Sequence, residues 1–293
     1  MGYLSNVAAR NLRFANRNKG MLVLSIVTSN GAALNLVSHI FEALQQRIRD
    51  RASAHQYMIN LSTFKTGRLR DLPALLDGSL FNGAIFNYTL PANDRLLETT
   101  VLPFPSLVIG REIEGYAYFV PSLNTGLIAD HMLQESGAKR PVMLFEPALT
   151  QATERRVWQF CEVFEGEFAI KPRRLEAPTS SEAAARDAGD SFLAQKGRID
   201  ALFAVHDNLA AGAFSSLRAR HLDILGQVKV VGMGDSEWPE YPTPSLSGAG
   251  AEESRVYDQA AAMILEVCET GRSTAETIYT HAKAVHREST KPA

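Results

Sequence analysis

Short apolar runs alternate with amphipathic segments from residue 21 onward, and this alternation is the feature that most restricts the fold of the chain. The run Met21–Val27 is apolar on both faces, as in a buried parallel strand. A turn cluster follows at Thr28–Gly31. From Ala33 to Ile48, apolar residues recur at spacings of three and four, which predicts a helix with one apolar stripe. Together these segments form one β–turn–α unit.

The same pattern repeats toward the C-terminus. Further strands are predicted at Tyr57–Leu61, Gly83–Tyr88, Ser106–Ile109, Pro141–Phe145, Ala201–Val205 and Val228–Gly232, with a last strand near Thr277–Val285. Helices are predicted at Arg68–Asp77, Asp94–Thr100, Gly126–Glu135, Glu154–Phe164, Glu182–Gln195, Leu209–Arg220 and Glu252–Glu269. Alternating strands and helices predict parallel sheets covered by helices on both faces. The number of units favours two such sheets.

The predicted fold class is therefore α/β, with two doubly wound parallel-sheet lobes and several crossovers between them. A chain of 293 residues commonly divides in this way. The expected boundaries are 1–19 for a linker, 20–119 plus 248–273 for the first lobe, and 120–247 plus 274–293 for the second. Ligands bind beyond the carboxyl ends of strands in such sheets, and two facing lobes can close on a small molecule. This pattern alone leaves a sensor, a transporter's binding protein and an enzyme open.

Charge is distributed unevenly along the chain. Residues 1–20 contain Arg10, Arg13, Arg17 and Lys19 and no acidic residue, so this arm carries +4 and leaves −6 for the rest of a chain whose net charge is −2. A basic arm on an acidic body is typical of proteins that touch phosphate at one end. A solvated N-terminal segment explains the charge equally well.

Several classes of site find no support in the sequence. The two cysteines, Cys161 and Cys268, are far apart and form no CxxC, which favours a reducing compartment over a disulfide framework. The longest apolar run near the N-terminus is far too short to span a bilayer, so a cytoplasmic location is expected. The sequence has no GxSxG, HExxH or P-loop and no histidine or cysteine cluster with metal spacing. We therefore expect no catalytic residues, no metal and no cofactor, and predict that the chain is not an enzyme.

The segment Gly2–Arg13 resembles the junction between the DNA-binding head and the sensor in the LacI family, with Ser5 in place of the usual proline. In that family the junction forms a hinge helix in the minor groove, where a leucine wedges between base pairs. The resemblance implies DNA contacts from the matching residues, which are Asn6, Ala9, Arg10, Leu12 and Arg13.

Further matches follow in the family's order. Asp200–Phe214 resembles its apolar strand, Asn-Asp pair and alanine-rich helix, with His206 in the asparagine position and Asp207 in the aspartate position. Val228–Asp235 resembles the next strand, although glycine replaces the first of its two aspartates. Arg287–Thr290 resembles the closing motif. Weaker matches are the Glu154–Arg156 segment and the end of the strand at Phe86.

The resemblance covers almost the whole chain and implies a type I periplasmic-binding-protein-like fold. It also implies a ligand-responsive DNA-binding transcriptional regulator, usually a repressor, that forms a homodimer. The implied partners are a sugar or sugar derivative and operator DNA, the latter through a helix-turn-helix head that this sequence does not contain. The changes at His206 and Gly234 predict a ligand unlike a plain galactoside. The alternatives are a solute-binding protein with the same two-lobed fold, which the basic arm and missing signal segment disfavour, and an enzyme.

Nine residues are the expected effector contacts: Ser29, Asn30, Phe86, Arg111, Arg155, His206, Asp207, Asp235 and Trp238. Several of them have an equally simple structural role. Ser29 and Asn30 can cap the first helix, Arg155 can lie on a helix surface, and Trp238 can pack in a loop. Asp207 can cap a helix that begins at Asn208.

Overall fold

The computed structural model describes most of the chain from Met21 to Lys291. The described residues are 21–28, 34–51, 56–63, 82–87, 97–99, 102, 104–120, 122–147, 150–195, 198–224, 226–233, 242–250, 253–270 and 277–291. The predicted hinge residues Asn6, Ala9, Arg10, Leu12 and Arg13 lie outside them, as do Ser29, Asn30, Asp235, Trp238 and the helix expected at Arg68–Asp77. The described part divides into two compact units, one ending at Val120 and including Ser254–Ile278, the other comprising Pro121–Glu253 and the residues from Tyr279 onward.

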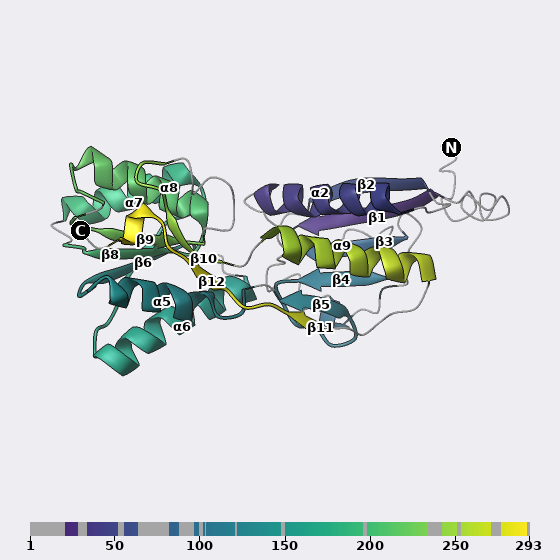
Figure 1. Cartoon of the computed structure of the whole chain (residues 1–293), viewed down its shortest axis with the longest axis horizontal. Helices are drawn as coiled ribbons and strands as arrows, with labels where there is room; N and C mark the ends of the chain where they lie inside the picture. Colours follow the sequence, from purple (N-terminus) through teal and green to yellow (C-terminus); the bar gives the residue numbers. More distant parts are fainter. Residues whose placement is uncertain are drawn as a thin grey trace. The chain divides into compact units, whose positions relative to one another are not determined.

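The first unit is built on a six-stranded sheet with the strand order β11-β5-β4-β3-β1-β2. Its elements are β1 Met21–Thr28, α2 Leu34–Asp50, β2 Gln56–Thr63, β3 Gly83–Asn87, β4 Ser106–Ile109, β5 Ala117–Val120, α9 Glu253–Thr270 and β11 Thr277–Tyr279. Strands β1 to β5 pair in parallel. Helices α2 and α9 lie side by side (Figure 1), where Arg47 and Asp258 form an ion pair.

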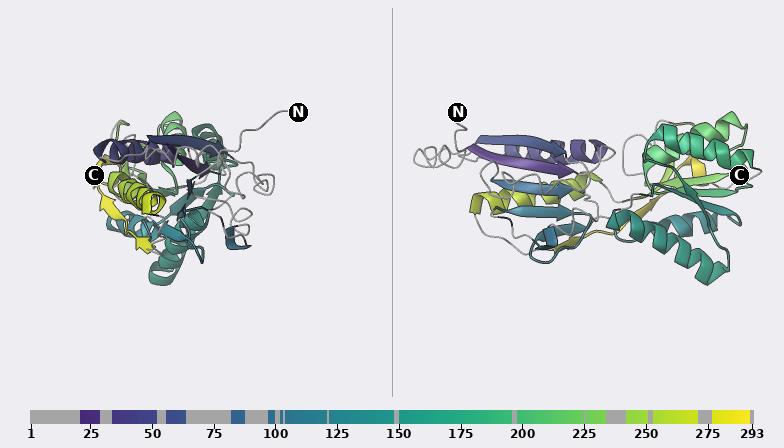
Figure 2. Two further views of the ribbon diagram at one scale, coloured as in Figure 1. Left: turned by 90° about the vertical axis from the view of Figure 1, so that its right-hand side faces the viewer. Right: turned by 180° about the vertical axis from the view of Figure 1, so that it is seen from behind.

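The second unit is built on another six-stranded sheet, with the order β12-β10-β9-β8-β6-β7. Its elements are α5 Thr125–Glu135, β6 Pro141–Phe145, α6 Gln151–Phe168, β7 Arg173–Glu176, α7 Glu182–Ala194, β8 Ala201–Ala204, α8 Asp207–Ala219, β9 Lys229–Gly232, β10 Ser247–Gly250, β12 Lys283–Val285 and a 3-10 helix at Glu288–Thr290. Helices α5 and α6 cover one face and α7 and α8 the other (Figures 1 and 2). All pairings are parallel except that between β10 and β12.

Burial explains why the second unit forms these elements. Strands β6, β8 and β9 are buried along their whole length, as expected for parallel strands covered on both faces. Small residues bring the helices of each pair close together. A Cβ on Gly126 of α5 would lie 2.4 Å from the carbonyl oxygen of Arg156 in α6, and a Cβ on Gly212 of α8 would lie 2.3 Å from that of Glu182 in α7. Glycine is therefore required at both helix contacts.

The predicted α/β class with two parallel sheets is confirmed, but some boundaries differ. Thr277–Val285 is not one strand, because β11 joins the first sheet and β12 joins the second. Residues 248–250, expected in the first lobe, belong to β10, which pairs with β9 and β12 of the second unit. Conversely, Thr277 and Ile278, expected in the second lobe, fall in the first unit. The chain thus changes units a few residues later than the hydrophobic pattern indicates.

The closing segment ties the second sheet together. Ser289 donates a hydrogen bond to the carbonyl of Val230 at 2.6 Å and accepts one from the Ser247 amide at 2.8 Å. The hydroxyls of Ser247 and Thr290 lie 2.7 Å apart. The motif at Arg287–Thr290 therefore joins the chain end to β9 and β10, and these contacts are structural.

Candidate ligand site on the second sheet

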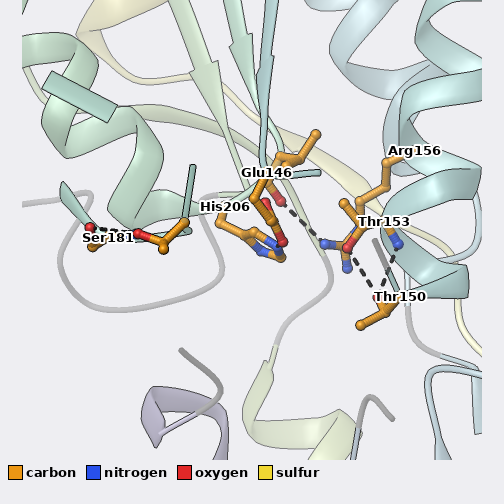
Figure 3. Close-up of polar contacts among 8 residues, drawn as sticks. Glu146, Thr150, Thr153, Arg156, Ser181 and His206 are labelled. Carbon is orange, nitrogen blue, oxygen red and sulfur yellow. Dashed lines mark hydrogen bonds and ion pairs between the residues drawn. The ribbon is translucent and has the colours of Figure 1, made fainter. Parts of the chain in front are cut away.

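Polar side chains gather where neighbouring strands β6 and β8 end. Glu146 directly follows β6, and His206 follows β8 after one residue. Because β6 and β8 are parallel and paired, their carboxyl ends lie at the same edge of the sheet. Figure 3 shows Glu146 and His206 side by side at this edge. This is the edge at which ligands bind in open α/β sheets.

Glu146 and His206 form a hydrogen-bonded pair. His206 Nε2 lies 3.0 Å from Glu146 Oε1, and the charge of the pair depends on protonation of the imidazole. Glu146 is only 4 % exposed, whereas His206 is partly exposed. The second carboxylate oxygen, Oε2, is buried and has no hydrogen-bond partner among the described residues. Buried polar atoms are normally paired, so this oxygen can still accept a hydrogen bond from a ligand.

The start of α6 reaches the same part of the sheet. Thr150 caps the helix by accepting a hydrogen bond from the Thr153 amide at 3.3 Å. Arg156, one turn further along, is buried and donates from Nη1 to the carbonyl of Val205 at 3.2 Å. Figure 3 shows these α6 side chains beside the Glu146–His206 pair. The side-chain oxygen of Gln151 is a second buried acceptor without a partner in the described part of the chain.

The two predicted contact residues that follow β8 lie in different environments. His206 lies at the sheet edge, and Asp207 lies in the first turn of α8. The helix begins at Asp207 with His206 in the cap position, so the alternative in which Asp207 caps a helix from Asn208 is wrong by one residue. A Cβ on Gly232 would lie 2.8 Å from Asp207 Oδ1, which shows that this carboxylate lies against the backbone of β9.

The predicted effector contact Arg155 is followed on α6 by a second arginine, Arg156, in a different environment. Arg155 is half-buried on α6 and forms no hydrogen bond or ion pair among the described residues, whereas Arg156 is buried and lies beside the pair. The helical period indicates only that Arg156 faces the buried side of α6, because it lies three residues after buried Thr153 and four before buried Phe160; its contact with Val205 follows from the fold.

In the first unit, two predicted contact residues are engaged with their own surroundings. Phe86 is buried in a core cluster with Val108 and Leu97. Arg111 forms an ion pair with Glu98. The next residue after Phe86 was missed: Asn87, at the carboxyl end of β3, is fully buried, and neither polar atom of its side chain has a partner among the described residues. Asn87 is thus an unsatisfied polar group, as judged from the described residues, at the carboxyl edge of the first sheet.

The described residues offer neither a metal centre nor a membrane-spanning helix. They contain no group of three or more histidine, cysteine or acidic side chains that could hold a metal ion. Among the same residues no helix is long and apolar enough to cross a membrane. Burial raises the pKa of Cys268 to about 12 and raises that of Cys161, so these two thiols are poor nucleophiles.

Comparison with known proteins places the site in a family. The model of the periplasmic binding protein-like domain matches residues 129–290. The chain belongs to this family. The matched residues include Glu146, Arg156 and His206 together with every strand of the second sheet. No curated protein matches the sequence.

Solved structures with the same fold extend the likeness over nearly the whole chain. A LacI-family transcription regulator from Clostridium acetobutylicum has 18 % identity and a TM-score of 0.77, covering 91 % of this chain and 99 % of that one. A LacI-family regulator from Enterococcus faecalis V583 with bound ribose has 17 % identity and a TM-score of 0.76, with coverage of 92 % and 99 %. The Lac repressor bound to ONPG in the repressed state has 20 % identity and a TM-score of 0.77, with coverage of 98 % and 86 %. The predicted likeness to LacI-family regulators is therefore confirmed in fold.

Proposed function

We propose that the chain is the effector-binding and dimerisation part of a ligand-responsive transcriptional regulator, usually a repressor in the family it resembles. The observation that carries this proposal is the unsatisfied carboxylate oxygen of Glu146 beside His206, at the edge where such sheets bind ligands. Two solved structures of this fold hold ribose and ONPG. We infer that the effector is a sugar or sugar derivative, and that its binding is coupled to operator binding by the full-length protein.

Thermal unfolding with added sugars, sugar acids, polyols and nucleosides tests the binding claim on this chain. A compound present at about 100 times its dissociation constant stabilises the folded state by about 2.7 kcal/mol. An active compound should raise the unfolding temperature less in His206→Ala than in the unmodified chain. In His281→Ala we expect the full rise, because His281 is exposed and lies outside the site. A panel without any stabilising compound, or equal shifts in the two variants, would contradict the assignment.

The gene itself tests the regulator claim. We expect the reading frame upstream of the Gly2 codon to encode a helix-turn-helix, whereas a signal peptide at this position would favour a solute-binding protein. The full-length product should bind operator DNA with an affinity that the active compound changes. An unchanged affinity would contradict coupling between the two sites.

Dimerisation is proposed through the outer face of the first unit. β2 is an edge strand, and it exposes Met58 and Leu61, the latter to 45 %. Beside it, an open groove between α2 and β2 is lined by Phe41, Gln45, Ile48, Arg49, Tyr57 and Ile59. Exposed apolar surface of this kind marks interaction sites, and an edge strand can pair with a second copy.

The molar mass in solution tests the proposed interface. We expect a dimer for the unmodified chain and a monomer for Leu61→Lys, because a charge in the middle of an apolar interface is costly to desolvate. Leu127→Lys is the matched control, since Leu127 is an exposed leucine on α5 of the other unit. A dimer that Leu61→Lys leaves intact would place the interface elsewhere.

A further inference from the structure

Glu146 is an unusual residue for the interior of a protein. Its carboxylate is almost completely buried, and one of its two oxygens is held by His206. Among the described residues, His206 is its only ion-pair partner, and Oε2 has no partner of any kind. Carboxylates are rarely buried without full pairing, because removing the charge from water is costly. An incompletely paired buried carboxylate at a ligand-binding edge is therefore more consistent with recognition than with folding.

The surroundings of Glu146 provide acceptors and positive helix ends. Gln151, at the start of α6, carries a second buried oxygen without a partner in the described residues. Helices α6 and α8 both begin at this edge, and helix N-termini attract negative charge. By themselves these N-termini would favour an anionic ligand. Here the protein supplies the negative charge through Glu146, so the remaining need is for hydrogen-bond donors.

Among the described residues, the charged side chains around the Glu146–His206 pair do not donate a hydrogen bond to Glu146 Oε2. From α6, the guanidinium of Arg156 donates to the carbonyl of Val205 and forms no ion pair with Glu146. From α8, Asp207 adds a second carboxylate, which lies against Gly232 of β9. A carboxylate only accepts hydrogen bonds, so the complementary group on a ligand is a hydroxyl or an amine.

We propose that Glu146 is a specificity-determining residue that accepts a hydrogen bond from a hydroxyl or amino group of the effector through Oε2. His206 positions the carboxylate by holding Oε1. The same negative charge rejects sugar acids and phosphate esters at this edge, because two like charges would be brought together in a place with little water. The inference rests on the proposed function and narrows its ligand class from sugars and derivatives of any charge to neutral or amino compounds.

Titration calorimetry with ligands matched in shape but not in charge tests this inference. The compounds are ribose, ribonate and ribose 5-phosphate, with glucose, glucosamine and gluconate as a second set. We expect binding only among ribose, glucose and glucosamine, whose neutral or amino groups offer donors without negative charge. Glucosamine binding more tightly than glucose would identify the donor as an amine, and the reverse order would identify a hydroxyl. Binding of an acid or phosphate ester as tight as that of its neutral counterpart would overturn the proposal.

Glu146→Gln tests the residue itself, since it keeps the size of the side chain and removes its charge. We expect at least about tenfold weaker binding of the neutral or amino compound, because a hydrogen bond to a charged acceptor is lost. Glu154→Gln is the matched control, because Glu154 is exposed on α6 and the change in net charge is the same. The ligand-free Glu146→Gln variant should unfold at the temperature of the unmodified chain or higher, as expected after removal of a poorly paired buried charge.

The outcomes separate this inference from the proposed function. If compounds bind but Glu146→Gln and Glu154→Gln bind them equally well, the role of Glu146 is refuted and the sensor function stands. If no compound of either set binds, the sugar-sensing function fails and this inference fails with it. Should Glu146→Gln not fold, the residue has a structural role that our inference excludes, and the charge preference of the unmodified chain still decides the ligand class.

Discussion

Asp130 on α5 should make the stability of the second unit depend on pH. Its side chain is 1 % exposed, and burial raises its pKa from 3.8 to about 6. A hydrogen bond from Gln134 at 2.6 Å and the neighbouring His131 act in the opposite direction but do not compensate for burial. The other carboxylate oxygen has no partner among the described residues. The folded state therefore favours the protonated, neutral form of Asp130.

The sign and size of the effect follow from linkage. Because the folded state binds this proton more tightly than the unfolded state, stability is highest below the unfolded pKa of 3.8 and falls as the pH rises toward about 6. Above about pH 6 the stability contributed by the protonated Asp130 is fully lost. A difference of about two pKa units corresponds to about 3 kcal/mol, since each unit is worth about 1.4 kcal/mol.

Asp130→Asn removes the ionisation and keeps the shape of the side chain. We expect the free energy of unfolding of this variant, relative to the unmodified chain, to increase by about 3 kcal/mol between about pH 4 and pH 7 and to stay constant above that. The test is how this difference in the free energy of unfolding changes with pH, not its absolute value at pH 4.

Urea unfolding followed by tryptophan fluorescence measures this difference. Trp158 lies on α6 of the second unit, so its fluorescence reports the unfolding of that unit. Asp187→Asn on α7 is the control, because Asp187 is exposed and the change in net charge is the same. Parallel pH curves for Asp130→Asn and the unmodified chain would refute the reasoning.

Two further predictions concern packing and hydrogen bonding in the second unit. Gly126→Ala should lower the free energy of unfolding by about 1–3 kcal/mol, because its Cβ would lie 2.4 Å from the carbonyl oxygen of Arg156. Gly166→Ala on α6, where a Cβ meets nothing within 4 Å, should instead stabilise by up to about 1 kcal/mol, and urea unfolding in which both variants move alike would contradict the steric argument. Ser289→Ala should cost about 1–3 kcal/mol in the same assay, because the buried amide of Ser247 loses its acceptor. An unchanged unfolding midpoint would show that the hydrogen bond between Ser247 and Ser289 does not contribute to stability.

The strands that were predicted well are those whose own residues require burial. Ser106–Ile109 and Pro141–Phe145 match β4 and β6 to the residue, because continuous apolar runs are stable only inside a sheet covered on both faces. The apolar strand β5 was missed, and so were β7 and β10. β7 is a charged edge strand of sequence RRLE, and β10 consists of serine, glycine and alanine. Their strand structure comes from pairing with neighbours, which leaves no hydrophobic period in the sequence.

The sequence by itself determined the positions that follow directly from local pattern. His206 and Asp207 come immediately after a buried strand, so their place at a carboxyl edge required only the strand assignment. Glu146 and Arg156 depended on the tertiary structure. Glu146 is 60 residues away from its partner His206, and Arg156 binds a carbonyl 49 residues away. Burial and long-range pairing are properties of the folded sheet and its helices, and for this reason only the tertiary structure could decide that these two residues belong to the site.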